Sequence, residues 1–281
     1  MRAPQKAPLI PKSLLRLFTL TLISFPVFAQ SPSTVYTISL AQATSHLVHV
    51  DINLPPGAPD RDVQMPVWDA LYQVRDFAEY VNWIHAKDTD GHPLAVRKLE
   101  KSLWRISGAT NGAEIEYEIF ANVAGPYGAE LNSQHAFFNL AQILMYPVDA
   151  RSGPIHLRFS EVPQGWHIAT ALENSGQEFL APDFDRLVDS PVEIGEFKES
   201  DFDEGGAHYR IVVDAQSADY DMKKVVSIVR PIVAVETSWM NDHSFQTFVF
   251  FYHFPRGPGG GGMEHAYSTA IEVSAQALQD D

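Results

Sequence analysis

Short segments in which apolar and polar residues alternate recur along most of this chain, and they constrain its fold more than any other feature. Examples are residues 34–40, 47–54, 154–160 and 208–215. Successive side chains of a β-strand point to opposite faces, so this pattern is typical of strands with one buried face. Strands at such short intervals predict a mainly β fold, either a β-sandwich or a saddle-shaped sheet.

Three further strand predictions concern particular segments. Residues 102–106 and 113–123 flank an Asn-Gly dipeptide that favours tight turns, so we expect them to form a hairpin. Residues 245–254 are almost entirely apolar and predict a buried strand. Residues 262–273 predict one more continuous strand near the end of the sequence.

A helix is predicted over residues 219–238, because apolar residues recur there every three or four positions. Asp219 or Asp221 is placed to cap its start. Pro231 lies inside the segment and should kink or divide it. We therefore expect a change of architecture near residue 215.

Three parts of the chain are predicted from these patterns. Residues 1–29 form a signal peptide, residues 30–215 a β domain, and residues 216–281 the incomplete start of a mixed α/β domain. The leader has a basic front followed by an apolar run at 17–28, and small residues favour cleavage after Ala29. An uncleaved membrane anchor is the alternative, but the run is short for a bilayer. We expect a secreted or periplasmic protein with no stable membrane insertion after cleavage.

Charge and cysteine content exclude several classes of function. The net charge is −15, and loss of the four basic leader residues would make it −19, which argues against a nucleic-acid partner. The chain has no cysteine, so disulfides, thiolate zinc sites and cysteine nucleophiles are excluded. Apolar residues make up 45% of the chain, enough for a packed core.

The eleven histidines raise the question of a metal site. No histidine is followed by glutamate, so the helical His-Glu-x-x-His zinc motif is absent. His46 and His49 are three residues apart beside a predicted strand and should point to opposite faces. His85 and His92 flank a turn without an evident third ligand. The sequence therefore predicts no metal ligand and no catalytic residue in this chain.

Four carboxylates lie close together at residues 184–197, namely Asp185, Asp189, Glu193 and Glu196. Paired carboxylates can serve as general acid and base, as in enzymes that act on carbohydrates. The alternative is a loop whose Asp and Ser side chains hydrogen-bond their own backbone. We favour the second interpretation.

The segment Gly-Gly-Gly-Gly-Met-Glu-His at 259–265 is the most specific part of the sequence. Alternation places Met263 and His265 on one face of a strand and Glu264 on the other. Bare glycines allow another backbone to approach closely, as when a peptide adds to a sheet edge. A carboxylate there could hold an α-ammonium group. The alternative is a flexible linker followed by an ordinary charged residue.

Residues 261–268 resemble the Gly-Gly-Leu/Met-Glu-His-x-x-Ser motif of the glycyl aminopeptidase family of zinc metallopeptidases, metallopeptidase family 61. Two further segments are similar to that family in the same order. Residues 65–81 match its Leu-Pro-x-Trp…Arg-Asp-Phe segment, and residues 184–197 match its Leu-Val-Asp-Ser-Pro-Val-Glu signature. The family's Pro-Gly-x-Tyr is replaced at 69–72 by Asp-Ala-Leu-Tyr.

The resemblance implies an N-terminal β-sandwich or saddle-like sheet domain followed by the truncated start of a thermolysin-like α/β catalytic domain. It implies that Glu264 binds the free N-terminus of a peptide substrate, with Gly261, Gly262 and Met263 alongside. His265 and Ser268 match the motif without an assigned role. Zinc is expected for the complete enzyme only, because the family's His-Glu-x-x-His is absent here.

The predicted function is therefore that of an exported zinc aminopeptidase-like protein whose chain here lacks the zinc-binding segment and is inactive alone. The alternative is a non-catalytic exported β-sandwich that binds peptides. If the helix and last strands lack covering partners, apolar surface should be exposed at residues 248–254.

Overall fold

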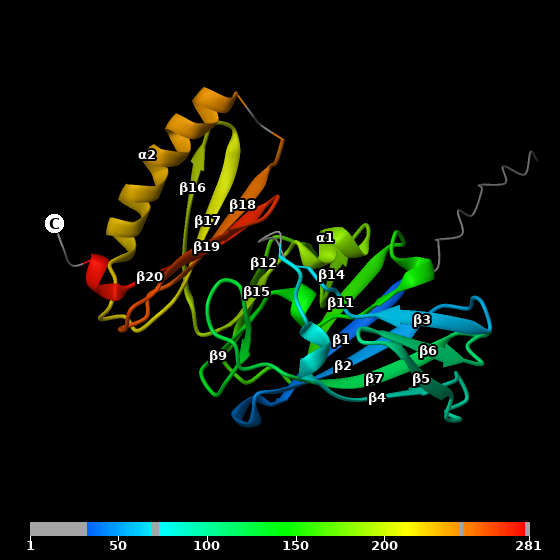
Figure 1. The fold of residues 1–281 in the computed structure, drawn as a ribbon. Coiled ribbons are helices and arrows are strands. Elements are labelled where there is room, and N and C mark those ends of the chain that lie inside the picture. The colour runs from blue at the N-terminus through cyan, green and yellow to red at the C-terminus, as the bar shows by residue number, and fades with distance from the viewer. Residues whose placement is uncertain (1–32, 69–72, 242–243, 279–281) are drawn as a thin grey trace, which may run out of the picture. The chain divides into compact units, whose positions relative to one another are not determined.

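A computed structural model describes residues 33–68, 73–241 and 244–278. Within these ranges the chain forms strands β1–β20 in four sheets and two α-helices, which confirms the predicted mainly β fold (Figure 1). The predicted signal peptide, residues 1–29, lies outside the described residues. No helix among the described residues has the length and apolar character needed to cross a bilayer.

The largest sheet has seven strands. In spatial order they are β13 (Glu173–Ser175), β14 (Glu178–Ala181), β11 (Ile155–Ser160), β1 (Thr34–Gln42), β2 (Leu47–Leu54), β7 (Ala113–Phe120) and β4 (Val81–Lys87). Strands β1 and β11 are parallel, and the other pairs are antiparallel. The predicted alternation is present, since Tyr36, Val50 and Ile115 are fully buried while their neighbours along each strand are partly exposed.

A four-stranded sheet shares the core of the seven-stranded sheet. Its strands are β10 (Tyr146–Pro147), β3 (Asp60–Gln64), β6 (Leu103–Ser107) and β5 (Ala95–Glu100). Val63, Trp104 and Ile106 belong to the same buried cluster as the large sheet. On the other face of β3 and β6, Arg105 makes two hydrogen bonds to the Asp62 carboxylate, and these lower the pKa of Asp62.

The predicted hairpin between residues 102–106 and 113–123 is wrong. β6 pairs with β3 and β5, whereas β7 pairs with β2 and β4 in the other sheet. The turn itself is present, because Gly112 has φ of +102° and its N–H donates to Ala109 O. A Cβ at position 112 would lie 2.7 Å from Leu54 O, so the turn has no room for a side chain there. The turn leads from β6 to β7 in the other sheet.

A third sheet and a short helix complete the region before residue 197. The sheet consists of β12 (His167–Thr170), β15 (Val192–Gly195), β9 (His135–Phe138) and β8 (Ala129–Leu131). Helix α1 (Phe184–Val188) begins at Asp183, whose side chain accepts a hydrogen bond from the N–H of Arg186. Helix α1 leads directly into β15.

The fourth sheet has five strands, covered on one face by a helix (Figure 1). The strands are β16 (Lys198–Glu204), β17 (Ala207–Asp214), β18 (Thr247–His253), β20 (Ser268–Val273) and β19 (Gly260–Glu264). Helix α2 (Met222–Met240) connects the parallel strands β17 and β18 and buries Val225, Val229 and Val233 against the sheet. Such a crossover is the usual link between parallel neighbours.

Helix α2 confirms the helix prediction, with two differences in detail. Asp221 caps it by accepting from the N–H of Lys223, whereas Asp219 forms an ion pair with Arg256. Pro231 does not divide the helix. The predicted boundary near residue 215 falls between β17 and α2, and strands from both sides of it share this sheet.

The predicted single strand at 262–273 is wrong, because the segment is a hairpin of β19 and β20 with a turn at 265–267. The expectation of apolar exposure at 248–254 is also wrong. Val249 and Phe251 are fully buried, and α2 covers the remaining aromatic side chains in part. The most exposed large apolar side chains of this layer lie on α2 instead, including Trp239 and Val235.

Candidate functional site

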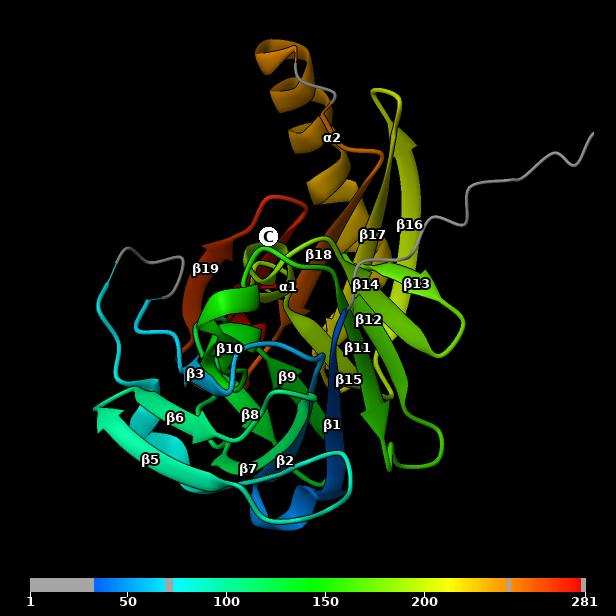
Figure 2. The same cartoon turned by 90° about the vertical axis from the view of Figure 1, so that its right-hand side faces the viewer.

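Strand β19, which carries the predicted site residues, is the outer strand of the five-stranded sheet (Figure 2). On one side it pairs with β20, and no described strand pairs with its other edge. The N–H of His265 donates to Ser268 O at 2.9 Å. Bonded and non-bonded pairs alternate in an antiparallel ladder, so the backbone N–H and C=O groups of Gly262 and Glu264 face the open edge.

The two faces of β19 are very different. Met263 is buried, and its Sδ lies 3.1 Å from Nδ2 of the buried Asn139. The side chain of Glu264 is exposed on the opposite face, as the alternation predicts. Among the described residues, none forms a side-chain hydrogen bond or an ion pair with Glu264. The strand is therefore anchored by one face and presents an uncompensated carboxylate on the other.

Tyr127 contacts the glycines of β19 at the open edge. Its hydroxyl accepts a hydrogen bond of 3.1 Å from the N–H of Gly262. A Cβ at Gly261 would lie 2.7 Å from the same oxygen, so the present position of Tyr127 requires a residue without a side chain there. One outward N–H of the edge is thus satisfied within the chain, by a side-chain tip that can rotate away.

The turn after Glu264 is held by a residue from another predicted motif. The Asp189 carboxylate accepts from Nδ1 of His265 at 3.0 Å and from the N–H of Ala266 at 2.9 Å. The His265 side chain is almost fully buried. Two of the three segments on which the family resemblance rests therefore meet in space. In the third segment, residues 69–72 lie outside the described residues.

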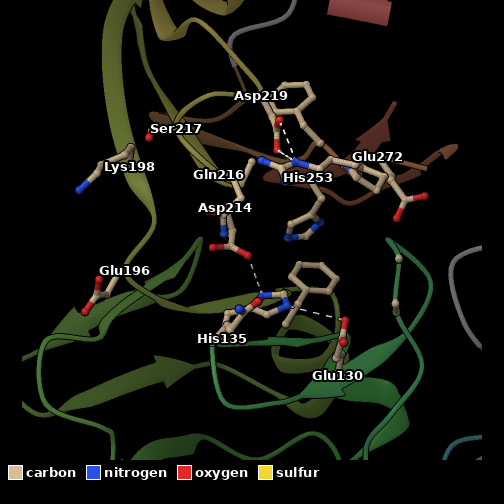
Figure 3. A pocket seen from close by; sticks show the side chains of 18 of the residues that line it. Glu130, His135, Glu196, Lys198, Asp214, Gln216, Ser217, Asp219, His253 and Glu272 are labelled. Carbon is tan, nitrogen blue, oxygen red and sulfur yellow. Dashed lines mark hydrogen bonds and ion pairs between the residues drawn. The ribbon is translucent and has the colours of Figure 1, made fainter. Parts of the chain in front are cut away.

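A second group of functional side chains surrounds Glu193, which is fully buried in β15. Its Oε1 lies 3.0 Å from His135 Nδ1, and its Oε2 lies 2.8 Å from His253 Nε2. Asp214 Oδ2 is also 3.0 Å from His135 Nδ1, and Glu130 Oε2 is 3.7 Å from His135 Nε2. Figure 3 shows His135 between Glu130 and Asp214, with His253 reaching the same pocket. We call His135, Glu193 and His253 the histidine–glutamate cluster.

The electrostatics of this cluster follow from burial and charge. Burial opposes protonation of His135, but Glu130, Glu193 and Asp214 outweigh it and raise its pKa to about 11. Burial favours the neutral form of Glu193, yet the hydrogen bonds from the two imidazoles lower its pKa. Burial, followed by the nearby Glu193 charge, raises the pKa of Asp214. Three carboxylates therefore converge on one imidazole, and only Glu193 is fully enclosed.

The sequence prediction missed this cluster. Its members are separated by 58 and 60 residues, and only the pairing of β9 with β15 and the packing of β18 bring them together. One signal was present, because Glu193 lies between the apolar residues Val192 and Ile194, although the segment was interpreted as a loop. A charge in a fully buried strand requires a partner of opposite charge or a metal.

The four carboxylates at 184–197 do not form an acid–base pair. Asp185 makes an ion pair with Arg151, Asp189 holds the turn at His265, and Glu193 joins the cluster. Glu196 is exposed. The interpretation as a loop is wrong, because the segment forms helix α1 and strand β15. Ser190 does bond the local backbone by donating to Arg186 O, whereas Asp189 and Glu193 bond residues of other segments.

The other histidines that were considered as metal ligands belong neither to the edge of β19 nor to the histidine–glutamate cluster. Nδ1 of His46 lies 2.7 Å from Leu131 O, and His49 stands beside Asp51 and Glu116 on the large sheet. His85 stacks on Trp83, and His92 contacts Asp88 within an exposed turn.

Comparisons with known proteins agree with the fold and with the sequence motifs. Residues 35–196 match the family model of the peptidase M61 N-terminal domain. An aminopeptidase N family protein from Idiomarina loihiensis has a similar structure, with a TM-score of 0.82 and 25% identity, over 87% of this chain and 43% of that one. The chain thus spans less than half the length of that protein.

Two further structures are more distant. An M1 zinc metallopeptidase variant from Deinococcus radiodurans aligns with a TM-score of 0.48 and 9% identity, over 88% of this chain and 60% of that one. The same variant bound to a Tyr-Ser-Ala substrate aligns with a TM-score of 0.48 and 8% identity, over 90% and 61%. A search of curated protein sequences found no match.

Proposed function

Because the chain belongs to the peptidase M61 N-terminal domain family, we propose that it supplies the substrate-binding edge of an exported aminopeptidase. The observation that carries the proposal is the unpaired carboxylate of Glu264 on the open edge of β19. The substrate class is a peptide with a free N-terminus, and the reaction of the complete enzyme is removal of the N-terminal residue.

The binding mode follows from the backbone of β19. An extended peptide can pair with the outward N–H and C=O groups of Gly262 and Glu264, as peptides do at exposed sheet edges. Its ammonium group then meets the Glu264 carboxylate. Glycines at 259–262 keep side chains away from the approaching peptide backbone. The Tyr127 hydroxyl has to release the N–H of Gly262 for this pairing to be complete.

The carboxylate contributes position rather than bond making. A charge-assisted hydrogen bond is worth about 1.5–3 kcal/mol, which is roughly a 10- to 100-fold difference in affinity. Fixing the N-terminus sets which peptide bond lies at the reacting centre.

The catalytic zinc of such enzymes does not fit the residues of this chain. The ligand set His-Glu-x-x-His is absent from the sequence, because none of the eleven histidines precedes a glutamate. We therefore assign no residue here to the catalytic metal or to the general base. We expect no release of glycine or alanine from peptides by the purified chain with added zinc, and measurable release would contradict this assignment.

The proposal is tested by peptide binding to the purified chain. Fluorescence anisotropy of a glycine-led peptide, labelled at its C-terminus, is compared with that of its N-acetylated form. Acetylation should weaken binding at least about 10-fold, and Glu264→Gln should remove this discrimination. Glu100→Gln, an exposed strand carboxylate in another sheet, is the matched control and should retain it.

Two outcomes would overturn the proposal. Equal affinity of the free and acetylated peptides for the unaltered chain would mean that no group recognises the ammonium. Discrimination that survives in the Glu264→Gln variant would place recognition elsewhere. Peptide binding with ammonium recognition but without a catalytic partner would support the alternative, a non-catalytic peptide-binding module.

A further inference from the structure

The histidine–glutamate cluster is placed where three strands from two sheets converge. His135 is contributed by β9, Glu193 by β15 and His253 by β18. One potential ligand atom from each of the three lies within 4.8 Å of the other two. All three side chains are largely buried, and Glu193 is fully enclosed. Their positions are fixed by sheet pairing, so little ordering is needed to bring the three groups together.

The surroundings of His135 hold more carboxylate groups than its ring can donate hydrogen bonds to. Two carboxylate oxygens, from Glu193 and Asp214, lie at the same distance of 3.0 Å from His135 Nδ1. A single N–H can donate well to only one of them, and the hydrogen bond goes to Glu193. Glu130 adds a third carboxylate on the other side of the ring. The three carboxyl groups of Glu130, Glu193 and Asp214 thus surround one imidazole, an arrangement of oxygen and nitrogen atoms that can attract a divalent ion.

The distances suit a small ion with tetrahedral coordination. Zinc binds imidazole nitrogen and carboxylate oxygen at about 2.0–2.2 Å, so neighbouring ligand atoms stand roughly 3.4 Å apart. The present separations of 3.0 and 2.8 Å are those of hydrogen bonds to Glu193. Replacing the bridging protons by an ion requires these two separations to widen by roughly half an ångström.

The surroundings provide an outer shell and an entry path. If Nδ1 of His135 binds the ion, its Nε2 points toward Glu130, the kind of carboxylate partner that orients ligating histidines. His135 and His253 line a pocket of about 880 Å³, and Glu130 and Asp214 line it as well (Figure 3). The pocket gives an ion a route to the cluster and leaves room for a water molecule as a fourth ligand.

We propose that His135, Glu193 and His253 form a binding site for a single zinc ion, separate from the catalytic zinc of the peptidase family. Two nitrogens and one oxygen favour zinc over magnesium or calcium, which prefer oxygen ligands alone. The ligands come from three strands instead of one helix. The ion ties the sheet of β9 and β15 to the five-stranded sheet, so it acts on stability and on the placement of β18 and its neighbours.

The test is zinc binding by the purified chain after treatment with a chelator, measured by isothermal titration calorimetry at neutral pH. We expect one zinc ion per chain, no comparable binding of magnesium, and a higher unfolding temperature with zinc. Protons should be released on binding, because the imidazoles must give up the hydrogens that now bridge to Glu193. Titration in buffers of different ionisation enthalpy counts these protons.

Variants locate the site. His253→Ala and Glu193→Gln should each weaken zinc binding by more than about 100-fold, since each removes a direct ligand. His49→Ala is the control, because His49 belongs to another group of His and acidic side chains, with Asp51 and Glu116. It should leave the affinity unchanged. A visible cobalt(II) spectrum typical of tetrahedral coordination supports the site in the unaltered chain, even if a variant fails to fold.

Three results would overturn the proposal. The first is no zinc binding by the unaltered chain. The second is binding that persists in folded His253→Ala and Glu193→Gln variants. The third is loss of binding in His49→Ala, which would place the ion on the large sheet. In each case the cluster is a metal-free network of hydrogen bonds between Glu193 and the two imidazoles. The peptide-binding proposal for Glu264 is unaffected by any of these outcomes.

Discussion

Replacing Glu193 by glutamine should destabilise the metal-free chain substantially, because its charge is fully buried between two imidazoles. The carboxylate oxygens lie 3.0 and 2.8 Å from His135 and His253. At an effective dielectric constant of about 20, the charge pair of Glu193 and His135 at 3.0 Å attracts by roughly 5–6 kcal/mol. Removal of Glu193 from water offsets much of this gain, since desolvation costs several kcal/mol per ion.

The net loss of unfolding free energy depends on the groups that stay buried in the Glu193→Gln variant. Removing one partner of a buried ion pair typically costs about 3–5 kcal/mol, because the other charge stays buried without compensation. Glutamine keeps the shape of glutamate and can still accept one hydrogen bond. The loss should therefore lie near the lower end, about 3 kcal/mol. With a urea m value of about 3 kcal/mol/M, the unfolding midpoint should fall by roughly 1 M.

The assay is urea unfolding followed by tryptophan fluorescence and circular dichroism, with a chelator present throughout. Glu196→Gln is the matched control, because this carboxylate is exposed three residues further along the chain. Its effect should be within about 0.5 kcal/mol. A Glu193→Gln midpoint that coincides with the control would refute the reasoning, since the buried charge would then contribute nothing to stability.

Two further perturbations test other parts of the structure. Gly261→Ala places a methyl group 2.7 Å from the Tyr127 hydroxyl and should cost about 1 kcal/mol of unfolding free energy, whereas Gly257→Ala, which meets nothing within 4 Å, should cost less. The lowered pKa of Asp62 means that its ion pair stabilises fully above pH 4 or so and is lost as pH falls through the folded-state pKa. The difference in unfolding free energy between the unaltered chain and Asp62→Asn should therefore shrink from pH 6 to pH 3, and a constant difference would contradict this.

Local sequence patterns predicted where individual strands and helices lie better than they predicted which strands pair with one another. Strand patterns located β1, β2, β7 and β11 of the large sheet, and apolar spacing located helix α2. The Asn-Gly turn at 111–112 was also correct, yet β6 and β7 joined different sheets. Turn chemistry depends on a few residues, whereas pairing depends on which buried face each strand can share. The split of 262–273 into two strands was missed because its turn is held by Asp189, far away in sequence.

The two candidate sites also differ in whether they depend on local sequence or on contacts between distant segments. Alternation along residues 262–265 predicted that Glu264 faces away from Met263, whereas its role as a substrate-binding residue was inferred from the family resemblance of residues 261–268 and stays a prediction. The histidine–glutamate cluster could not be predicted from the sequence, because His135 and His253 come close to Glu193 only when β9, β15 and β18 pack together. Glu193 was a partial indication, because it is a charged residue between apolar neighbours, but nothing nearby in the sequence indicated that His135 and His253 are its partners.

The most direct test of the central claim is nuclear magnetic resonance of the ¹⁵N-labelled chain titrated with a glycine-led tripeptide. If β19 binds the peptide at its open edge, the amide signals of Gly262 and Glu264 should shift most, and the N-acetylated tripeptide should produce much smaller shifts at the same concentration. Shifts of equal size with both peptides, or shifts centred away from β19, would contradict the assignment of Glu264 as the group that binds the substrate ammonium.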